Sequence, residues 1–98
     1  MREILKDFDN AFENKTRLGI MSALIVNDYL DFNTLKELLG VTDGNLASHL
    51  KYLEKAGYLT YKKKFVGRKP NTNYTATTSG INAFKKHIHA IEKLLNSH

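Results

Sequence analysis

An amphipathic helical segment runs directly into a basic hairpin within residues 42–73, and this arrangement limits the folds open to the chain. In the first half, TDGNLASHLKYLEKAG, three leucines recur at helical spacing: Leu46, Leu50 and Leu53. The spacing i, i+4, i+7 predicts one buried stripe along a helix. Gly57 follows the last apolar turn, as a glycine often does where a helix ends. We therefore expect this helix to lie on a core with its other face turned to solvent.

The other face of this helix is polar and has no acidic residue at its centre. At about 100° per residue, the side chains opposite the leucine stripe are those of Asn45, Ser48, Lys51, Tyr52 and Lys55, with His49 at the border. Amide, hydroxyl and ammonium groups can read base edges or neutralise phosphates. A solvated helix surface is the alternative interpretation of this face.

Two short strands separated by cations follow the helix. Residues 58–61 and 72–77 are rich in strand-forming residues, and Gly67 and Pro70 supply turn positions between them. The intervening cations are Lys62, Lys63, Lys64, Arg68 and Lys69. Side-chain alternation places the middle lysine of the run on the opposite face from its two neighbours. A helix that fits a major groove, next to a basic arm that reaches phosphates or the minor groove, predicts binding to duplex nucleic acid.

The remaining elements are predicted from apolar periodicity and capping residues. Helices are expected over 3–13, 16–27, 33–39 and 79–96, with a strand stub near 29–32. Their expected caps are Asn14 or Thr16, then Asn33, Thr42, and Thr78 or Ser79. The chain is predicted to be one domain, 1–98, of the α+β class, mostly α, in the order α-α-α-α-β-β-α.

Charge is unevenly distributed along the 98 residues, whose formal net charge is +5. Residues 1–60 hold 7 basic and 9 acidic residues, whereas residues 61–98 hold 8 basic residues and one acid. A basic surface confined to part of a small domain predicts a polyanionic partner, and solubility alone is the alternative. Because there is no signal-peptide pattern and no apolar run of about 20 residues, we expect a cytoplasmic protein and no membrane partner.

Chemistry beyond binding has little support in the sequence. The absence of cysteine excludes disulfides and thiolate-based metal or redox sensing. No nucleophile–base pair, phosphate-binding loop or zinc-protease motif is present, so we expect no enzyme activity and no cofactor. His87 and His89 lie about 200° apart on a helix and cannot share an ion within one chain. With Glu92 and His98 they are predicted to be exposed surface residues and not a metal site.

The last predicted helix carries a narrow apolar seam. Its members step by 3, 4, 3 and 4 residues: Ile81, Phe84, Ile88, Ile91 and Leu95. Such a 3.5-residue repeat is typical of a helix that packs along a partner helix. Together with Phe8 and Phe12 near the other terminus, the seam predicts a two-fold dimer. Packing within a single chain is the alternative.

Three segments together resemble the winged helix-turn-helix transcriptional regulators of the MarR/ArsR type. They are RLGIMSAL at 17–24, LKELLGVTDGNLASHLKYLEKAGYL at 35–59 and GRKPNTNYTATTSG at 67–80. The similarity covers roughly residues 15–96 and is strongest to the small single-domain winged helix DNA-binding members. It implies a winged helix-turn-helix fold, with the helix-turn-helix at about 33–57, the wing at about 58–77, and dimerisation helices at about 3–13 and 79–96.

The resemblance also implies residue roles and a function. Recognition-helix contacts would fall on Thr42, Asn45, Ser48, His49, Lys51, Tyr52 and Lys55, and wing contacts on Lys64, Arg68 and Lys69. Asp43 is expected to stabilise the helix N-terminus instead. A homodimer that binds double-stranded DNA at a pseudo-palindromic operator, as a repressor, is implied. Two alternatives stay open: a winged-helix protein–protein interaction module, and a sensor variant that responds to a metal or a small-molecule effector.

Overall fold

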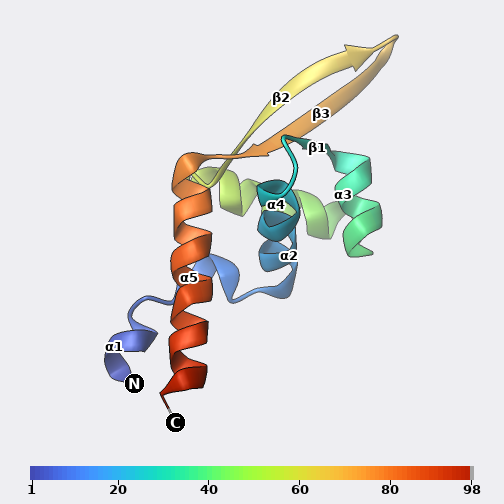
Figure 1. The fold of residues 1–98 in the computed structure, drawn as a ribbon. Helices are drawn as coiled ribbons and strands as arrows, with labels where there is room; N and C mark the ends of the chain where they lie inside the picture. Colours follow the sequence, from blue (N-terminus) through green and yellow to red (C-terminus); the bar gives the residue numbers. More distant parts are fainter. Residues whose placement is uncertain (98) are drawn as a thin grey trace.

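The computed structural model describes residues 1–97 and shows helices arranged around a small antiparallel sheet, from which a long hairpin projects (Figure 1). The predicted mostly helical α+β winged helix-turn-helix class is confirmed. In chain order the elements are α1 (Arg2–Leu5), the 3-10 helix η1 (Asn10–Phe12), α2 (Lys15–Ile25), β1 (Leu30–Asp31), α3 (Phe32–Leu39), α4 (Asp43–Lys55), β2 (Leu59–Val66), β3 (Lys69–Ala76) and α5 (Thr78–Asn96).

The N-terminal segment differs from the single helix expected over 3–13. It forms α1, a bend and η1, because the backbone of Asp9 is extended and its carboxylate accepts a hydrogen bond from the Ala11 N–H. A short acidic side chain that bonds its neighbouring backbone competes with helix hydrogen bonds, so one helix does not continue through residue 9.

Two helix ends follow the sequence prediction closely. Asn14 caps α2 by accepting from the N–H groups of Thr16 and Arg17, both at 3.0 Å. Gly40 ends α3 in the left-handed conformation, with φ of 63°, which a glycine adopts at little cost. The turn of the helix-turn-helix is therefore set by residues whose local chemistry was visible in the sequence.

Two predicted caps are wrong by one or two residues. Asp31, not Asn33, caps α3, and the hydrogen bond that its carboxylate accepts from Thr34 lowers the pKa of Asp31. Thr77, not Thr78 or Ser79, caps α5 by accepting from the N–H of Gly80 at 2.9 Å. In both places, a side chain that can accept the capping hydrogen bonds occurs one or two residues earlier, where a strand ends. The backbone there is already extended, which is the conformation that an N-cap residue needs.

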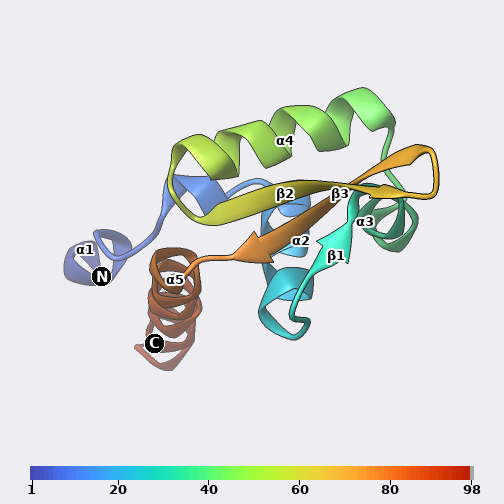
Figure 2. The same ribbon diagram turned by 90° about the horizontal axis from the view of Figure 1, so that it is seen from above.

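The sheet has the strand order β1-β3-β2 and is antiparallel throughout. The predicted strand stub is confirmed as β1, which pairs Leu30 with Tyr74. The hairpin pairs Leu59 with Ala76 at its base and Val66 with Lys69 at its tip. Seen from above, α4 runs along β2 while β1 lies on the far side of β3 (Figure 2). The hairpin therefore rises beside α4.

The core forms where α2, α3 and α4 meet the base of the sheet. The predicted leucine stripe of α4 is confirmed, since Leu46 and Leu53 are fully buried and Leu50 is almost so. They pack in one cluster with buried residues of the neighbouring elements: Phe12, Ile20, Met21, Leu24, Leu35 and Leu59. Among residues 1–97 no helix combines the length and the apolar character that a membrane crossing requires.

The start of α5 is pressed against the base of the hairpin at Gly80. A Cβ atom built on Gly80 would lie inside the van der Waals distance of the Tyr58 backbone, its carbonyl oxygen above all. The same carbonyl accepts a hydrogen bond from the Thr77 N–H at 3.0 Å. Only a residue without a side chain allows this close approach.

Replacing Gly80 with alanine should therefore destabilise the fold by about 1–3 kcal/mol, because backbone must move to admit the methyl group. The matched control is Gly44→Ala in α4, where a Cβ meets nothing within 4 Å. That variant should stabilise the protein by about 0.4–1 kcal/mol, since alanine loses less chain entropy on folding. Urea unfolding followed by circular dichroism measures both. Equal stability of the two variants would contradict the packing described at Gly80.

Candidate nucleic-acid interface

The outward face of α4 carries the polar side chains that the sequence pattern predicted. Asn45, Ser48, Lys51, Tyr52 and Lys55 are exposed, and His49 is half-buried. Thr42 is exposed too, but its hydroxyl already accepts a hydrogen bond from the Asn45 N–H at 3.2 Å as the helix cap. Because the leucine stripe is buried, the helix cannot rotate this polar face toward the core.

Arg17 of α2 contacts two residues of the polar face of α4, a role that no pattern in the sequence predicts. Its guanidinium lies 3.9 Å from the ring centre of Tyr52, and one of its terminal nitrogens lies 3.2 Å from Nδ1 of His49. The guanidinium also donates to the carbonyl oxygens of Ala11 at 2.8 Å and Asn10 at 3.3 Å. A guanidinium fixed by these backbone contacts restricts the orientations open to the two side chains on α4.

The environment of His49 favours its neutral form. Burial lowers the pKa of His49, and the positive charge of Arg17 lowers it further. A guanidinium nitrogen has no lone pair to offer, so Nδ1 accepts the hydrogen bond and Nε2 carries the proton. His49 can therefore present a neutral N–H donor at the border of the α4 face.

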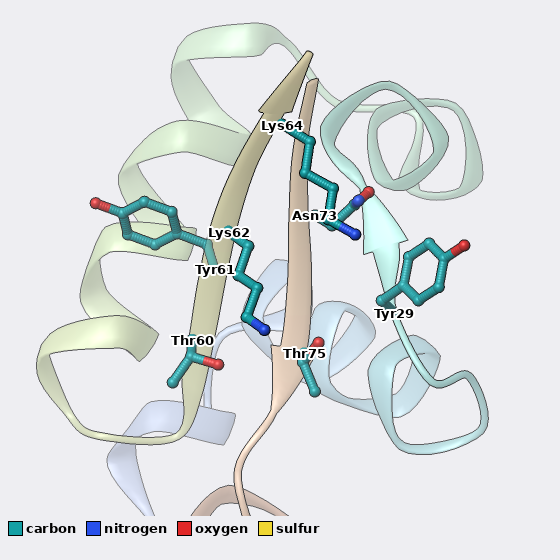
Figure 3. Close-up of a pocket in the computed structure, with 7 residues that line it drawn as sticks. All are labelled: Tyr29, Thr60, Tyr61, Lys62, Lys64, Asn73 and Thr75. Atoms are coloured by element: carbon teal, nitrogen blue, oxygen red, sulfur yellow. The ribbon is translucent and has the colours of Figure 1, made fainter. Parts of the chain in front are cut away.

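The two faces of the hairpin carry different lysines, as alternation predicted. Lys62 and Lys64 line a shallow groove of about 380 Å³ together with Asn73 and Tyr29, whereas Tyr61 turns toward α4 (Figure 3). Tyr61 and its cross-strand partner Tyr74 line a smaller hollow with Leu50 of α4. Lys63 shares the face of Tyr61 because side chains two residues apart point the same way.

This arrangement alters the expected roles of two lysines. Lys64, a sequence candidate for wing contacts, lies on the face away from α4. Lys63, which was not a candidate, lies on the face shared with α4. The alternation was visible in the sequence, but which face α4 covers depends on how the hairpin docks, and periodicity alone does not reveal that.

The hairpin tip exposes free positive charge. Gly67, with φ of 66°, and Arg68 form the two-residue connection, and Lys69 begins β3. All residues from 60 to 70 are exposed, and in the described part of the chain no ion pair involves a cation of the hairpin. Unpaired cations on a projecting arm can neutralise phosphates without first breaking an internal contact.

Asp43 has the structural role that was expected of it. It lies in the first turn of α4, where a carboxylate interacts favourably with the helix dipole, and it pairs with Lys36 of α3 at 2.8 Å. This ion pair joins the two helices across the tight turn. Both groups are substantially exposed, so its contribution to stability is small.

The apolar seam of α5 is only partly covered by its own chain. Four members, Ile81, Phe84, Ile88 and Ile91, are half-buried, and Leu95 is 73% exposed. The side of α5 that is buried carries Gly80, His87 and Ala90 instead. Apolar side chains left at this level of exposure along a projecting helix are available to a partner.

The two N-terminal phenylalanines occupy different places. Phe12 is 2% exposed and lies in the hydrophobic core of its own chain, stacked on Tyr58 and edge-on to Phe84. Its side chain is therefore not available for the dimer contact that was expected of it. Phe8 is half-buried against His87, with ring centres 5.1 Å apart. The helical spacing that suggested a shared face is interrupted by the bend at Asp9.

His87 is buried, so its prediction as an exposed histidine is wrong. It is 2% exposed, and its Nδ1 accepts a hydrogen bond from the Asp9 N–H at 3.0 Å. His87 lies on the side of α5 that the N-terminal segment covers, and helical periodicity alone does not predict that contact. Within residues 1–97 no cluster of three potential metal ligands exists, and His98 lies outside the described residues.

Tyr58 ties the same N-terminal segment to the base of the hairpin. Its hydroxyl donates a hydrogen bond to the Asp9 carboxylate, and this bond together with burial raises the pKa of Tyr58 to about 12. Its ring stacks on Phe12 at 5.5 Å. The wing base, the N-terminal segment and α5 therefore meet at one residue.

Comparison with known proteins agrees with this geometry. The family model described as "Winged helix DNA-binding domain" matches residues 16–95. The uncharacterized protein MJ0432 of Methanocaldococcus jannaschii is 40% identical over 83 residues, which cover 85% of this chain and 90% of that protein. The transcriptional regulator homologue protein of Pyrococcus horikoshii OT3 is 28% identical, with a TM-score of 0.84 over 97% of this chain and 92% of that one.

A protein of Enterococcus faecalis V583 assigned to the MarR family of transcriptional regulators has the same fold, with 24% identity and a TM-score of 0.69 over 88% of this chain and 74% of that one. The chain belongs to the winged helix DNA-binding domain family. In this winged-helix fold, α3 and α4 form the helix-turn-helix and the β2–β3 hairpin forms the wing.

The contact between Arg17 and His49 can be tested by titration. Replacing Arg17 with methionine removes the positive charge and keeps much of the burial, so the pKa of His49 should rise partway toward its ordinary value. NMR titration of the imidazole C–H resonances measures this shift. Lys15→Met, at the exposed start of the same helix, is the matched control and should leave the titration of His49 unchanged. An unchanged midpoint in the Arg17 variant would mean that the two side chains do not interact in solution.

Proposed function

We propose that the protein is a homodimeric transcriptional regulator of the cytoplasm that binds specific double-stranded DNA and represses by occupying a pseudo-palindromic operator. The observation that carries this proposal is the position of α4, whose polar face has no acidic residue at its centre, beside a hairpin of unpaired cations. A helix of this width fits the major groove, and an adjacent basic arm reaches the neighbouring backbone or minor groove.

The side chains on α4 divide by chemistry. Asn45 and Ser48 lie one turn apart and carry the amide and hydroxyl groups that bond base edges or phosphates. Lys51 and Lys55, one turn apart further along, suit phosphate contacts that position the protein without reading sequence. Tyr52, held over the guanidinium of Arg17, offers a hydroxyl in a restricted orientation.

On the hairpin, the contacts are assigned to its tip and to the face shared with α4. Arg68 projects from the two-residue connection, where a guanidinium can enter a narrow minor groove, whose negative potential attracts it. Lys69 begins the return strand beside it, and Lys63 replaces Lys64 as the lysine directed to the α4 side. The polar face and the cationic wing also argue against a protein–protein interaction module. For such a module, an acidic or apolar face would be expected.

Dimer formation is proposed through α5. The partly covered residues Ile81, Phe84, Ile88, Ile91 and Leu95 run along a helix that projects past the body of the domain beside α1 (Figure 1). Burying this seam against its copy removes apolar surface from water, which is the main driving force for association. Two-fold symmetry would then place the two α4 helices about 34 Å apart, on successive turns of one face of a duplex.

Duplex binding should weaken steeply with salt, because each phosphate neutralised by a cation releases condensed counterions. Lys51→Ala and Arg68→Ala should each lower affinity for bound genomic fragments and reduce the log–log salt slope by about 1. Lys93→Ala, near the far end of α5, is the matched control and should leave the slope unchanged. Fluorescence anisotropy over a salt series measures the slopes. Absent or salt-insensitive binding would overturn the proposed function.

A further inference from the structure

Phe65 lies uncovered near the tip of the wing and is 75% exposed. It faces Pro70 across the hairpin, and cross-strand partners share a face of the sheet. Counting by twos from Tyr61, this is the face turned toward α4. Val66, 67% exposed, turns to the opposite face. An aromatic ring and a proline ring therefore form an apolar point on the side of the wing where α4 presents its polar residues.

The surroundings of this apolar point are strongly cationic. Lys63 precedes it on the same face, and Arg68 and Lys69 lie at the turn beside it. No acidic residue occurs between Glu54 and Glu92. A second copy of the wing placed tip to tip would oppose like charges, which is unfavourable. The fitting occupant has negative charge at its rim and stacked apolar surfaces within, and the minor groove of a DNA duplex has both.

We propose that Phe65, backed by Pro70, enters the minor groove as a wedge and partly unstacks one base step of the duplex that α4 reads. This inference rests on the proposed function and adds a deformation to it. Apolar side chains inserted from the minor groove kink DNA by about 20–90° toward the major groove. At the step under the wing the minor groove faces the protein, so such a kink opens that groove and bends the duplex away from the wing.

The length of the wing permits this insertion. Seven residue steps separate Leu59, buried in the core, from Val66 at the turn, and at about 3.3 Å per residue they span about 23 Å. The wedge is thus carried well beyond the body of the domain, as the projecting hairpin shows (Figure 1). The cations at the turn would hold the two phosphate strands while the ring lies between them.

A wedge also gives sequence preference without hydrogen bonds to bases. Pyrimidine–purine steps unstack and kink more readily than others, so the protein should prefer a TA or CA step at the position under the wing. This selectivity is separate from any base contact made by Asn45 or Ser48 in the major groove. Changing Phe65 should therefore relax the preference at that one step and leave the preferences under α4 intact.

The test uses the full chain and a bound duplex that carries 2-aminopurine at the step under the wing. Binding should raise the fluorescence of this base as it unstacks, and energy transfer between dyes on the duplex ends should report a bend. Phe65→Ala should abolish both signals and lower affinity by at least about 5-fold, the low end of what one aromatic contact to a base contributes. The salt slope should stay unchanged, because no charge is removed. Phe65→Leu, which keeps an apolar wedge, should retain a reduced bend.

Val66→Ala is the matched control, since it shortens a similarly exposed side chain on the other face, and it should leave fluorescence, bend and affinity unchanged. Salt-dependent binding with no fluorescence rise, or with an unchanged bend in Phe65→Ala, would overturn the wedge and leave the proposed function standing. Sedimentation without DNA tests whether the ring makes a protein contact instead. If Phe65→Ala lost self-association, the ring would belong to a contact between protein chains, and the wedge would be overturned. Absence of any duplex binding would overturn both proposals.

Discussion

The orientation of α4 depends on the burial of three leucines, and the rest of the candidate interface depends on that orientation. Leu46, Leu50 and Leu53 pack against α2 and the base of the sheet, so rotating the helix would expose large apolar side chains to water. The polar face is consequently held outward without any contact of its own. The Arg17 guanidinium then restricts His49 and Tyr52 on that face. A hydrophobic constraint thereby presents polar groups in a fixed arrangement, which lowers the entropy lost when they bind.

A second junction, at Tyr58, sets where the wing and α5 leave the core. Its carbonyl is in contact with the start of α5 at Gly80, its hydroxyl bonds Asp9, and its ring stacks on Phe12. The N-terminal segment that passes through this junction also supplies the carbonyl groups that hold Arg17. The proposed dimer helix and the proposed recognition helix are therefore joined through one continuous set of contacts around η1.

Local pattern predicted most of the elements, although it missed the break in the N-terminal helix and two caps, and tertiary contact decided the roles of other residues. The leucine stripe, the lysine alternation and the cap of α2 depend on neighbours within a few positions, so periodicity and side-chain chemistry were sufficient. Arg17 reaches His49 across 32 positions, and nothing local distinguishes it from an exposed arginine. His87 was misassigned for the same reason, because its burial depends on a segment 78 positions away.

The chain contains no cysteine, which permits the most direct test of the central claim that α4 and the wing bind one duplex together. A single cysteine placed by Ser48→Cys or by Arg68→Cys can carry an iron chelate that cleaves nearby DNA. With the chelate at Ser48→Cys, the offset between the cleavage sites on the two strands should be that of a cutter in the major groove. With the chelate at Arg68→Cys, the offset should be that of a cutter in the adjacent minor groove. Each should occur at two inverted positions about one helical turn apart. Stronger cleavage from a chelate at Lys93→Cys on α5 than from either position would contradict the account.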